Sequence, residues 1–115
     1  MHSLVNLTPH SITLYSPTGI HEIAPSGQLA RIRSSSVQVG EIGGVPIIRP
    51  TFDDISGLPA PSNDTVYIVS SVVLTALRTN GELREDLVAP GTGPNDSAVR
   101  DPNGKVTGIT RFVCM

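Results

Sequence analysis

Short runs of alternating apolar and polar residues recur along the whole chain, and most of them end near a glycine or a proline. This pattern is typical of many short β-strands joined by tight turns. We expect the first three runs to form a meander, because only brief turns separate them. The runs that predict strands are residues 4–7, 12–15, 20–23, 29–33, 37–42, 45–48, 65–69, 87–89, 98–100 and 105–113.

Residues 65–69 give the strongest strand prediction, because nearly every side chain there is β-branched or aromatic. Such a segment is typical of a strand covered on both faces, so we expect it at the centre of a sheet. After Ser70 and Ser71, residues 72–78 carry apolar side chains at the i, i+4 spacing of a helix. A serine N-cap, an arginine in the last turn and Asn-Gly at residues 80–81 mark its ends. We therefore predict one helix of about two turns.

Proline and glycine predict where the chain turns or leaves regular structure. Pro46 lacks a backbone N–H, which indicates that residues 45–48 form an edge strand or contain a bulge. Residues 49–64 hold several prolines and few apolar side chains, so they predict a long loop. Asp-Pro-Asn-Gly at residues 101–104 predicts a type I turn within a final hairpin.

Together these elements predict the fold class. We expect residues 1–115 to form a single domain of the α+β class that is mostly β. Its strands would form a compact sheet or a partly open barrel, with one short helix after a central strand. The hydrophobic fraction of 38%, carried mainly by Val, Ile and Leu, supplies a modest aliphatic core for one such domain.

Composition and charge exclude several classes of partner. Two Phe, two Tyr and no Trp leave few rings on which nucleic-acid bases or sugars could stack. The formal net charge is −2, with 8 basic and 10 acidic residues spread along the chain. We find no basic stripe that would neutralise a phosphate backbone, so a nucleic acid polymer is not an expected partner.

Cysteine and histidine are too sparse to predict a disulfide or a metal site. Cys114 is the single cysteine, and this usage fits a reducing cytoplasm. His2, His10 and His21 contain no His-x-x-x-His pair, so we expect no metal and no cofactor. The chain shows no basic leader and no apolar run near the roughly 20 residues of a membrane helix. We therefore expect neither a visible export signal nor a membrane partner.

Three hydrogen-bonding side chains gather where the first predicted strand turns over. They are Asn6, Thr8 and His10, with Pro9 between the last two. Such a group could contact the base or the ribose of a ligand. The alternative interpretation is a turn in which Asn6 and Thr8 satisfy their own backbone.

The junction between the central strand and the helix is the second candidate site. The first amides of a helix have no intrahelical partners and carry a partial positive charge that suits phosphate or carboxylate. Ser70 and Ser71 add two hydroxyls at this end. Simple N-capping is the alternative, since the glycine and lysine motifs of dinucleotide and P-loop sites are absent.

Arginine dominates the basic residues, with seven arginines to one lysine. Planar, bidentate recognition of phosphate favours arginine, and we expect Arg100 to hold a phosphate. The alternative is structural ion pairing, for which Arg100 with Asp101 and Arg84 with Asp86 are candidates. We expect at least one of these two pairs to form.

Catalysis has little support in the sequence. No Gly-x-Ser-x-Gly elbow is present, and Cys114 is almost terminal. Asp53 and Asp54 are adjacent carboxylates, but they lie in the predicted loop without a partnering strand. We predict no catalytic residues.

Several segments together carry a family resemblance. They are residues 5–12, 39–42, 44–46, 57–59, 66–70, 84–91 and 99–101, with Gly104. Together they resemble a family of short proteins found in bacteriophage and bacterial genomes, and the resemblance spans nearly the whole chain. It implies a phage or prophage origin, hence the cytoplasm of a host cell, and carries over no catalytic residues.

The leading functional hypothesis is a non-enzymatic protein that captures a small phosphorylated molecule. By analogy with the small sponges by which phages sequester host signals, the ligand would be an ADP-ribose-type or cyclic nucleotide immune signal. It could lie at the interface of a homo-oligomer. One alternative is a structural or assembly protein of the virion. The other is a small hydrolase of such nucleotides, with His10 as acid or base.

Overall fold

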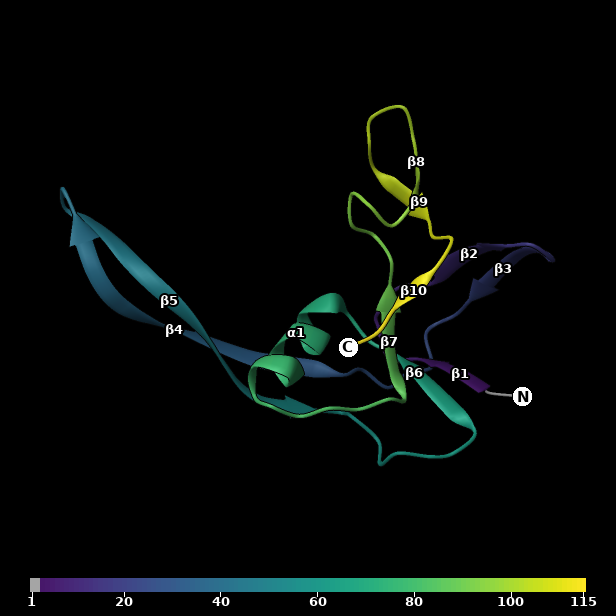
Figure 1. Ribbon diagram of the computed structural model, residues 1–115, viewed down its shortest axis with the longest axis horizontal. Helices are drawn as coiled ribbons and strands as arrows, with labels where there is room; N and C mark the ends of the chain where they lie inside the picture. The colour runs from purple at the N-terminus through teal and green to yellow at the C-terminus, as the bar shows by residue number, and fades with distance from the viewer. Residues whose placement is uncertain (1–2) are drawn as a thin grey trace.

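The computed structural model describes residues 3–115, with the side chains of all but residues 34 and 52–54. The fold is of the α+β class and mostly β, as predicted, and its strands form several small sheets rather than a closed barrel within the described residues. In chain order the elements are β1 (Ser3–Asn6), β2 (Ile12–Ser16), β3 (Gly19–Ile23), β4 (Arg31–Ile42), β5 (Val45–Ser56), β6 (Thr65–Ile68), α1 (Ser71–Thr79), β7 (Leu87–Pro90), β8 (Val99–Arg100), β9 (Val106–Gly108) and β10 (Phe112–Val113) (Figure 1).

The central sheet has the strand order β1-β6-β7-β10. Strands β1, β6 and β7 run parallel, and β10 pairs with β7 antiparallel. The central position predicted for β6 is therefore confirmed. The expected opening meander is wrong, because β2 pairs with β3 while β1 joins β6 instead. This pairing places Asn6 and Leu7 in the interior, each 1% exposed, where a three-stranded surface meander would leave them less covered.

The larger of the two described core clusters lies between α1 and the central sheet, and the smaller one joins Ile68 to Ile12 and Ile109. On the helix, Val73 and Leu77 are buried at i, i+4 spacing. They pack in one cluster with Leu7, Val69 and Leu87 from the sheet and the turns that follow its strands. A helix this short is marginal alone, so burial of this apolar face stabilises it.

Both ends of α1 follow the predicted signals. Ser70 is the N-cap, and its hydroxyl accepts from the amide three residues on at 3.4 Å. At the other end the Gly81 amide donates to Arg78 at 3.1 Å, and the Glu82 amide donates to Leu77 at 2.9 Å. This pair of bonds is a Schellman motif, which requires the positive φ of 78° that Gly81 adopts.

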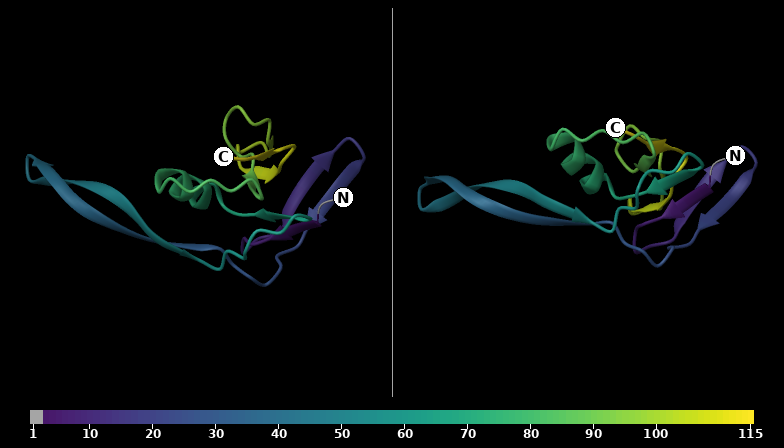
Figure 2. Two further views of the ribbon diagram at one scale, coloured as in Figure 1. Left: turned by 60° about the horizontal axis from the view of Figure 1, so that its bottom comes forward. Right: turned by 90° about the horizontal axis from the view of Figure 1, so that it is seen from below.

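A long two-stranded ribbon formed by β4 and β5 projects from the rest of the molecule (Figures 1 and 2). The predicted strands 29–33 and 37–42 merge into β4, and β5 continues to Ser56. The long loop predicted over 49–64 is therefore wrong in its first half. Proline does not end β5, because β5 pairs only with β4 and its outer edge needs no donors. The edge strand predicted at Pro46 is confirmed.

The final hairpin forms as predicted around its turn but ends earlier. The Gly104 amide donates to Asp101 at 2.9 Å, and this turn joins β8 to β9. The expected strand 105–113 is divided, because Ile109 exchanges backbone bonds with β2 and β10 then pairs with β7. Among the described residues, no helix is both long and apolar enough to cross a membrane.

Candidate functional site

The carboxyl ends of the three parallel strands bring the predicted site residues to one edge of the central sheet. Asn6 pairs with Ile68 at the ends of β1 and β6. Thr8 and His10 follow β1, and Ser70 and Ser71 follow β6. We call the segments after β1, β6 and β7, residues 7–11, 69–71 and 91–98, the carboxyl edge. In open sheets with parallel strands, ligands commonly bind at this edge.

Asn6 holds the carboxyl edge together from inside. Its side-chain amide donates to His10 O at 2.8 Å and to Ile23 O at 3.1 Å. Its Oδ1 accepts from the Thr8 amide at 2.9 Å and from the Thr8 hydroxyl at 2.6 Å. The Asn6 carbonyl also accepts from the amide and the hydroxyl of Ser26, at 3.0 and 2.7 Å. The buried side chain of Asn6 therefore joins β1, the turn after it and the end of β3.

These bonds form the turn that we gave as the alternative to a ligand site, in which Asn6 and Thr8 satisfy the local backbone. The structure does bring Asn6, Thr8 and His10 together, but apart from the bond between the Asn6 and Thr8 side chains their contacts involve the backbone of the turn. The side chains of Asn6 and Thr8 form hydrogen bonds within the turn. His10 contributes its carbonyl, and its residue lies exposed at the surface. Of the three residues, His10 is the one that lies exposed.

The start of α1 is capped by Ser70 and lies exposed at the surface. Ser70 and Ser71 are exposed, and the Ser70 hydroxyl serves as the cap acceptor. The amides of Val73 and Leu74 bond to Ser70, whereas those of Ser71 and Val72 precede the first intrahelical bonds. No acidic residue occupies the first turn. The positive end of the helix is therefore not neutralised by its own side chains.

Arg100 joins the β8–β9 hairpin to the carboxyl edge. It is exposed, and its guanidinium donates to Gly104 O and to Thr92 O, each at 3.0 Å. The predicted partner Asp101 instead accepts from the amides of Asn103 and Lys105, each at 2.9 Å. Arg100 thus uses two of its five N–H donors on the backbone and keeps the others at the surface.

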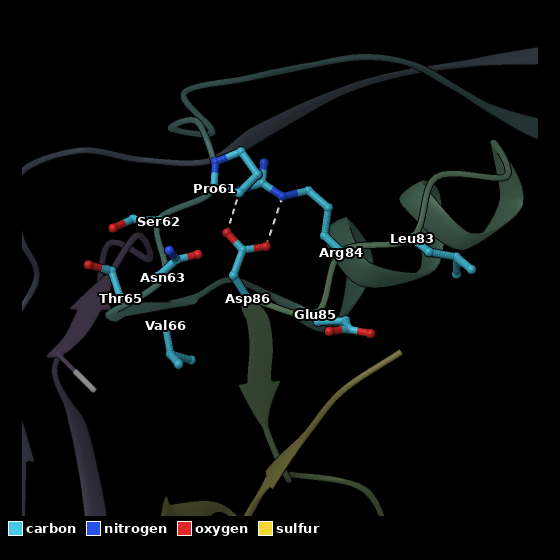
Figure 3. Close-up of a pocket in the computed structure, with 9 residues that line it drawn as sticks. All are labelled: Pro61, Ser62, Asn63, Thr65, Val66, Leu83, Arg84, Glu85 and Asp86. Atoms are coloured by element: carbon cyan, nitrogen blue, oxygen red, sulfur yellow. Dashed lines mark hydrogen bonds and ion pairs between the residues drawn. The ribbon is translucent and has the colours of Figure 1, made fainter. Parts of the chain in front are cut away.

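At the opposite, amino edge of the sheet lies a pocket of about 480 Å³ (Figure 3). Ser62, Asn63 and Thr65 line one side of it, and Leu83 and Glu85 lie on the other. A smaller pocket of about 270 Å³ lies against the same segment near Cys114 and Met115. None of the predicted site residues lines either pocket.

The ion pair expected between Arg84 and Asp86 forms inside the larger pocket. Arg84 Nε donates to Asp86 Oδ1 at 2.9 Å, and Arg84 Nη2 donates to Asp86 Oδ2 at 2.5 Å and to Pro59 O at 3.0 Å. The side chains are 17% and 11% exposed. The hydrogen bonds and charge of Arg84 lower the pKa of Asp86, although burial opposes the shift. The hydrogen bond to Asp86 raises the pKa of Arg84.

The two edges differ in what they can bind. Around the larger pocket, Arg84 is matched by Asp86, and Glu85 adds a further negative charge. This pocket therefore does not favour an anion. The sequence could indicate its ion pair, but the pocket exists because residues 57–64 fold back over the start of β6. That return is a tertiary event without a local signal.

Among the described side chains, no three His, Cys, Asp or Glu gather as a metal ion would require. Comparisons with protein-family models, curated proteins and solved structures found no match to this chain. Function must therefore be inferred from its own geometry.

Proposed function

We propose that this protein binds a small phosphorylated ligand at the carboxyl edge without transforming it. The convergence of the three parallel strand ends with the start of α1 carries this proposal. The phosphate would sit at the amides of Ser71 and Val72 and the hydroxyls of Ser70 and Ser71, where the helix dipole favours negative charge. Thr8 and Asn6 would serve as the frame rather than as contacts.

His10 and Arg100 complete the proposed site. The exposed ring of His10 would contact the base or ribose, and the remaining donors of Arg100 would meet a second phosphate oxygen. In the proposed biological role, a phage or prophage protein captures an ADP-ribose-type or cyclic nucleotide signal in the host cytoplasm. Sequestration would lower the free concentration of that signal and so blunt the host's immune response.

A single substitution tests the phosphate position without unfolding the helix. Ser71→Glu places a carboxylate at the first helical position, where the dipole tolerates it but a phosphate would be repelled. The control is Gln38→Glu, which adds the same charge on the projecting ribbon. We expect ADP-ribose or a cyclic dinucleotide to raise the melting temperature of the parent and of the control, but not that of Ser71→Glu.

The same samples test the absence of turnover. Mass spectrometry after incubation should return the nucleotide intact, and denaturing protein purified from infected cells should release a bound nucleotide. The proposal fails if no nucleotide or inorganic phosphate shifts the parent protein's melting temperature, or if a cleaved product accumulates.

The projecting ribbon favours a second candidate, a structural or assembly protein of the virion. Protruding arms with exposed aliphatic side chains are suited to contacts between subunits. Mass spectrometry of purified particles separates the two candidates. A stoichiometric amount of this chain in the particle supports assembly, whereas its absence from the particle supports the binding protein.

A further inference from the structure

We propose that the outer half of the β4–β5 ribbon is a dimerisation arm, whose apolar face packs against the same face of a second copy of this chain. The surface lies apart from the carboxyl edge. The inference therefore stands whether or not the proposed ligand binds.

The outer half of the ribbon receives no cover from its own chain. Between residues 35 and 50 every residue is exposed except Gly40, which is half-buried. Among the described side chains, the ribbon reaches the core at its base, through partly buried Ile55 and through Ala30 just before β4. An isolated two-stranded ribbon is marginally stable in water, so a long uncovered one calls for a partner.

The pairing register sorts the ribbon into two unlike faces. Residues paired across an antiparallel ribbon share a face, and successive residues alternate between faces. The apolar face carries the pairs Ile42–Val45, Gly40–Ile47 and Val37–Arg49. The opposite face, which we call the polar face, carries Glu41–Pro46, Gln38–Ile48 and Ser36–Pro50, so that a polar residue stands in each pair. Val39, 49% exposed, lies at the register shift. On the apolar face, the exposed fractions of Val37, Ile42, Val45 and Ile47 run from 40% to 70%.

Both edges of the ribbon are guarded against strand addition. On β5, Pro46 and Pro50 lie four residues apart, so their missing N–H groups fall on the same outer edge. On β4, the register shifts between Ile32 and Ser34 and between Gln38 and Gly40 interrupt the ladder. Association through an edge is therefore disfavoured, which leaves the apolar face as the contact surface.

Gly40 lies at the register shift of β4 that follows Gln38, and its own surroundings leave room for a side chain. Its φ is not positive, and a Cβ there would lie 3.9 Å from Ile47 Cδ1, which is an ordinary contact. Glycine within a strand weakens it and often marks a bulge, such as the one here, or the close approach of another backbone. Gly40 lies at the middle of the apolar face, where a two-fold axis would bring two ribbons together.

A second copy fits this face better than a charged partner does. If two ribbons cross antiparallel near Gly40, the tip pair Ile42–Val45 of each meets Val37 and the aliphatic stem of Arg49 in the other. The Arg49 head group, the one charge on the face, can then reach solvent at the rim. Such a contact is isologous and closed, so it stops at a dimer.

The size of the face sets the expected strength of the dimer. The six residue pairs from Ser36–Pro50 to Ile42–Val45 span about 20 Å at roughly 3.4 Å per residue. A face this long and two strands wide is smaller than the roughly 800 Å² per partner of a standard interface. We therefore expect a dimer that dissociates on dilution through the micromolar range.

Sedimentation velocity of the full chain over a range of concentrations tests the proposal with a matched pair of variants. Ile47→Glu places a charge on the apolar face, and Ile48→Glu places it on the polar face one residue away. We expect the parent and Ile48→Glu to dimerise, and Ile47→Glu to remain monomeric with an unchanged circular dichroism spectrum.

Gly40→Val provides a second test that should not disturb the single chain. We expect it to keep the fold and to weaken dimerisation at least tenfold. A parent protein that stays monomeric at concentrations of hundreds of micromolar would overturn the proposal. So would equal weakening by Ile47→Glu and Ile48→Glu, or a Gly40→Val variant that dimerises as tightly as the parent.

Discussion

The central sheet and the projecting ribbon are built from the same kinds of residue and use them in opposite ways. In β6, Tyr67 and Ile68 are 8% and 0% exposed, because Tyr67 packs in the cluster that includes α1 and Ile68 packs with Ile12 and Ile109 in the second cluster. In the ribbon, Ile42 and Val45 are 70% and 64% exposed. Apolar alternation therefore indicates a strand in both regions, but only in the sheet does it indicate the core. In the ribbon it indicates a surface that lacks its cover.

The most direct test of this difference is to make the same type of substitution, isoleucine to alanine, once in each region. Ile68→Ala removes a fully buried side chain from the sheet and should lower the free energy of unfolding by about 2–5 kcal/mol. Ile48→Ala, at 57% exposure, should change it by less than about 0.5 kcal/mol. Urea unfolding of dilute protein measures both. Equal losses would mean that the ribbon is part of the cooperative core.

The next largest effect should come from Asn6, where the sheet meets the turns around it. Asn6→Ala leaves the carbonyls of His10 and Ile23 without their donor, and we expect a loss of about 2–4 kcal/mol. Thr8→Val removes one hydroxyl from the same turn and should cost about 1 kcal/mol. Thermal unfolding monitored by circular dichroism gives both values. A loss for Asn6→Ala no larger than that for Thr8→Val would show that Asn6 does not hold these segments together.

A smaller effect sharpens the boundary between ribbon and sheet, where Arg84 bonds to Pro59 and to Asp86. The pKa of Asp86 is lowered in the folded state, so the pair stabilises the fold above the ordinary pKa of about 3.9. Its contribution is lost as the pH falls below that value and through the lowered pKa. Asp86→Asn should cost about 1–2 kcal/mol at pH 7, with the difference from the parent shrinking below pH ~4.

Urea unfolding at neutral and acidic pH measures this dependence. Glu85→Gln, an exposed neighbour that forms no ion pair among the described residues, is the control and should show little change at pH 7. A cost for Asp86→Asn that persists undiminished at the lowest pH would contradict the proposed ionic origin.

Local signals made part of this fold predictable. The β-branched run of β6, the Ser70 cap and the Gly81 stop act within a few residues, and each element formed where they indicate. The turn at Asp101 and the pairing of Arg84 with Asp86 also connect close neighbours. The union of β1 with β6 spans about sixty residues, and nothing in residues 4–7 distinguishes a parallel partner from a hairpin partner.

The candidate site divides in the same way. The gathering of Asn6, Thr8 and His10 was predictable because these residues lie within one turn. The hydrogen bonds of Asn6 and Thr8 within the turn were also foreseeable as an alternative, because Asn and Thr side chains commonly bond to the nearby backbone. The amino-edge pocket was not, because it depends on how residues 57–64 return to the sheet.

The parallel union of β1 with β6 has a consequence for synthesis of the chain. Because Asn6 pairs with Ile68, β1 cannot complete its ladder until residue 68 has left the ribosome. The β4–β5 ribbon closes through a two-residue turn, and all of its strand pairing lies within residues 31–56. The growing chain therefore presents the whole sequence of its aliphatic arm before it can complete its core.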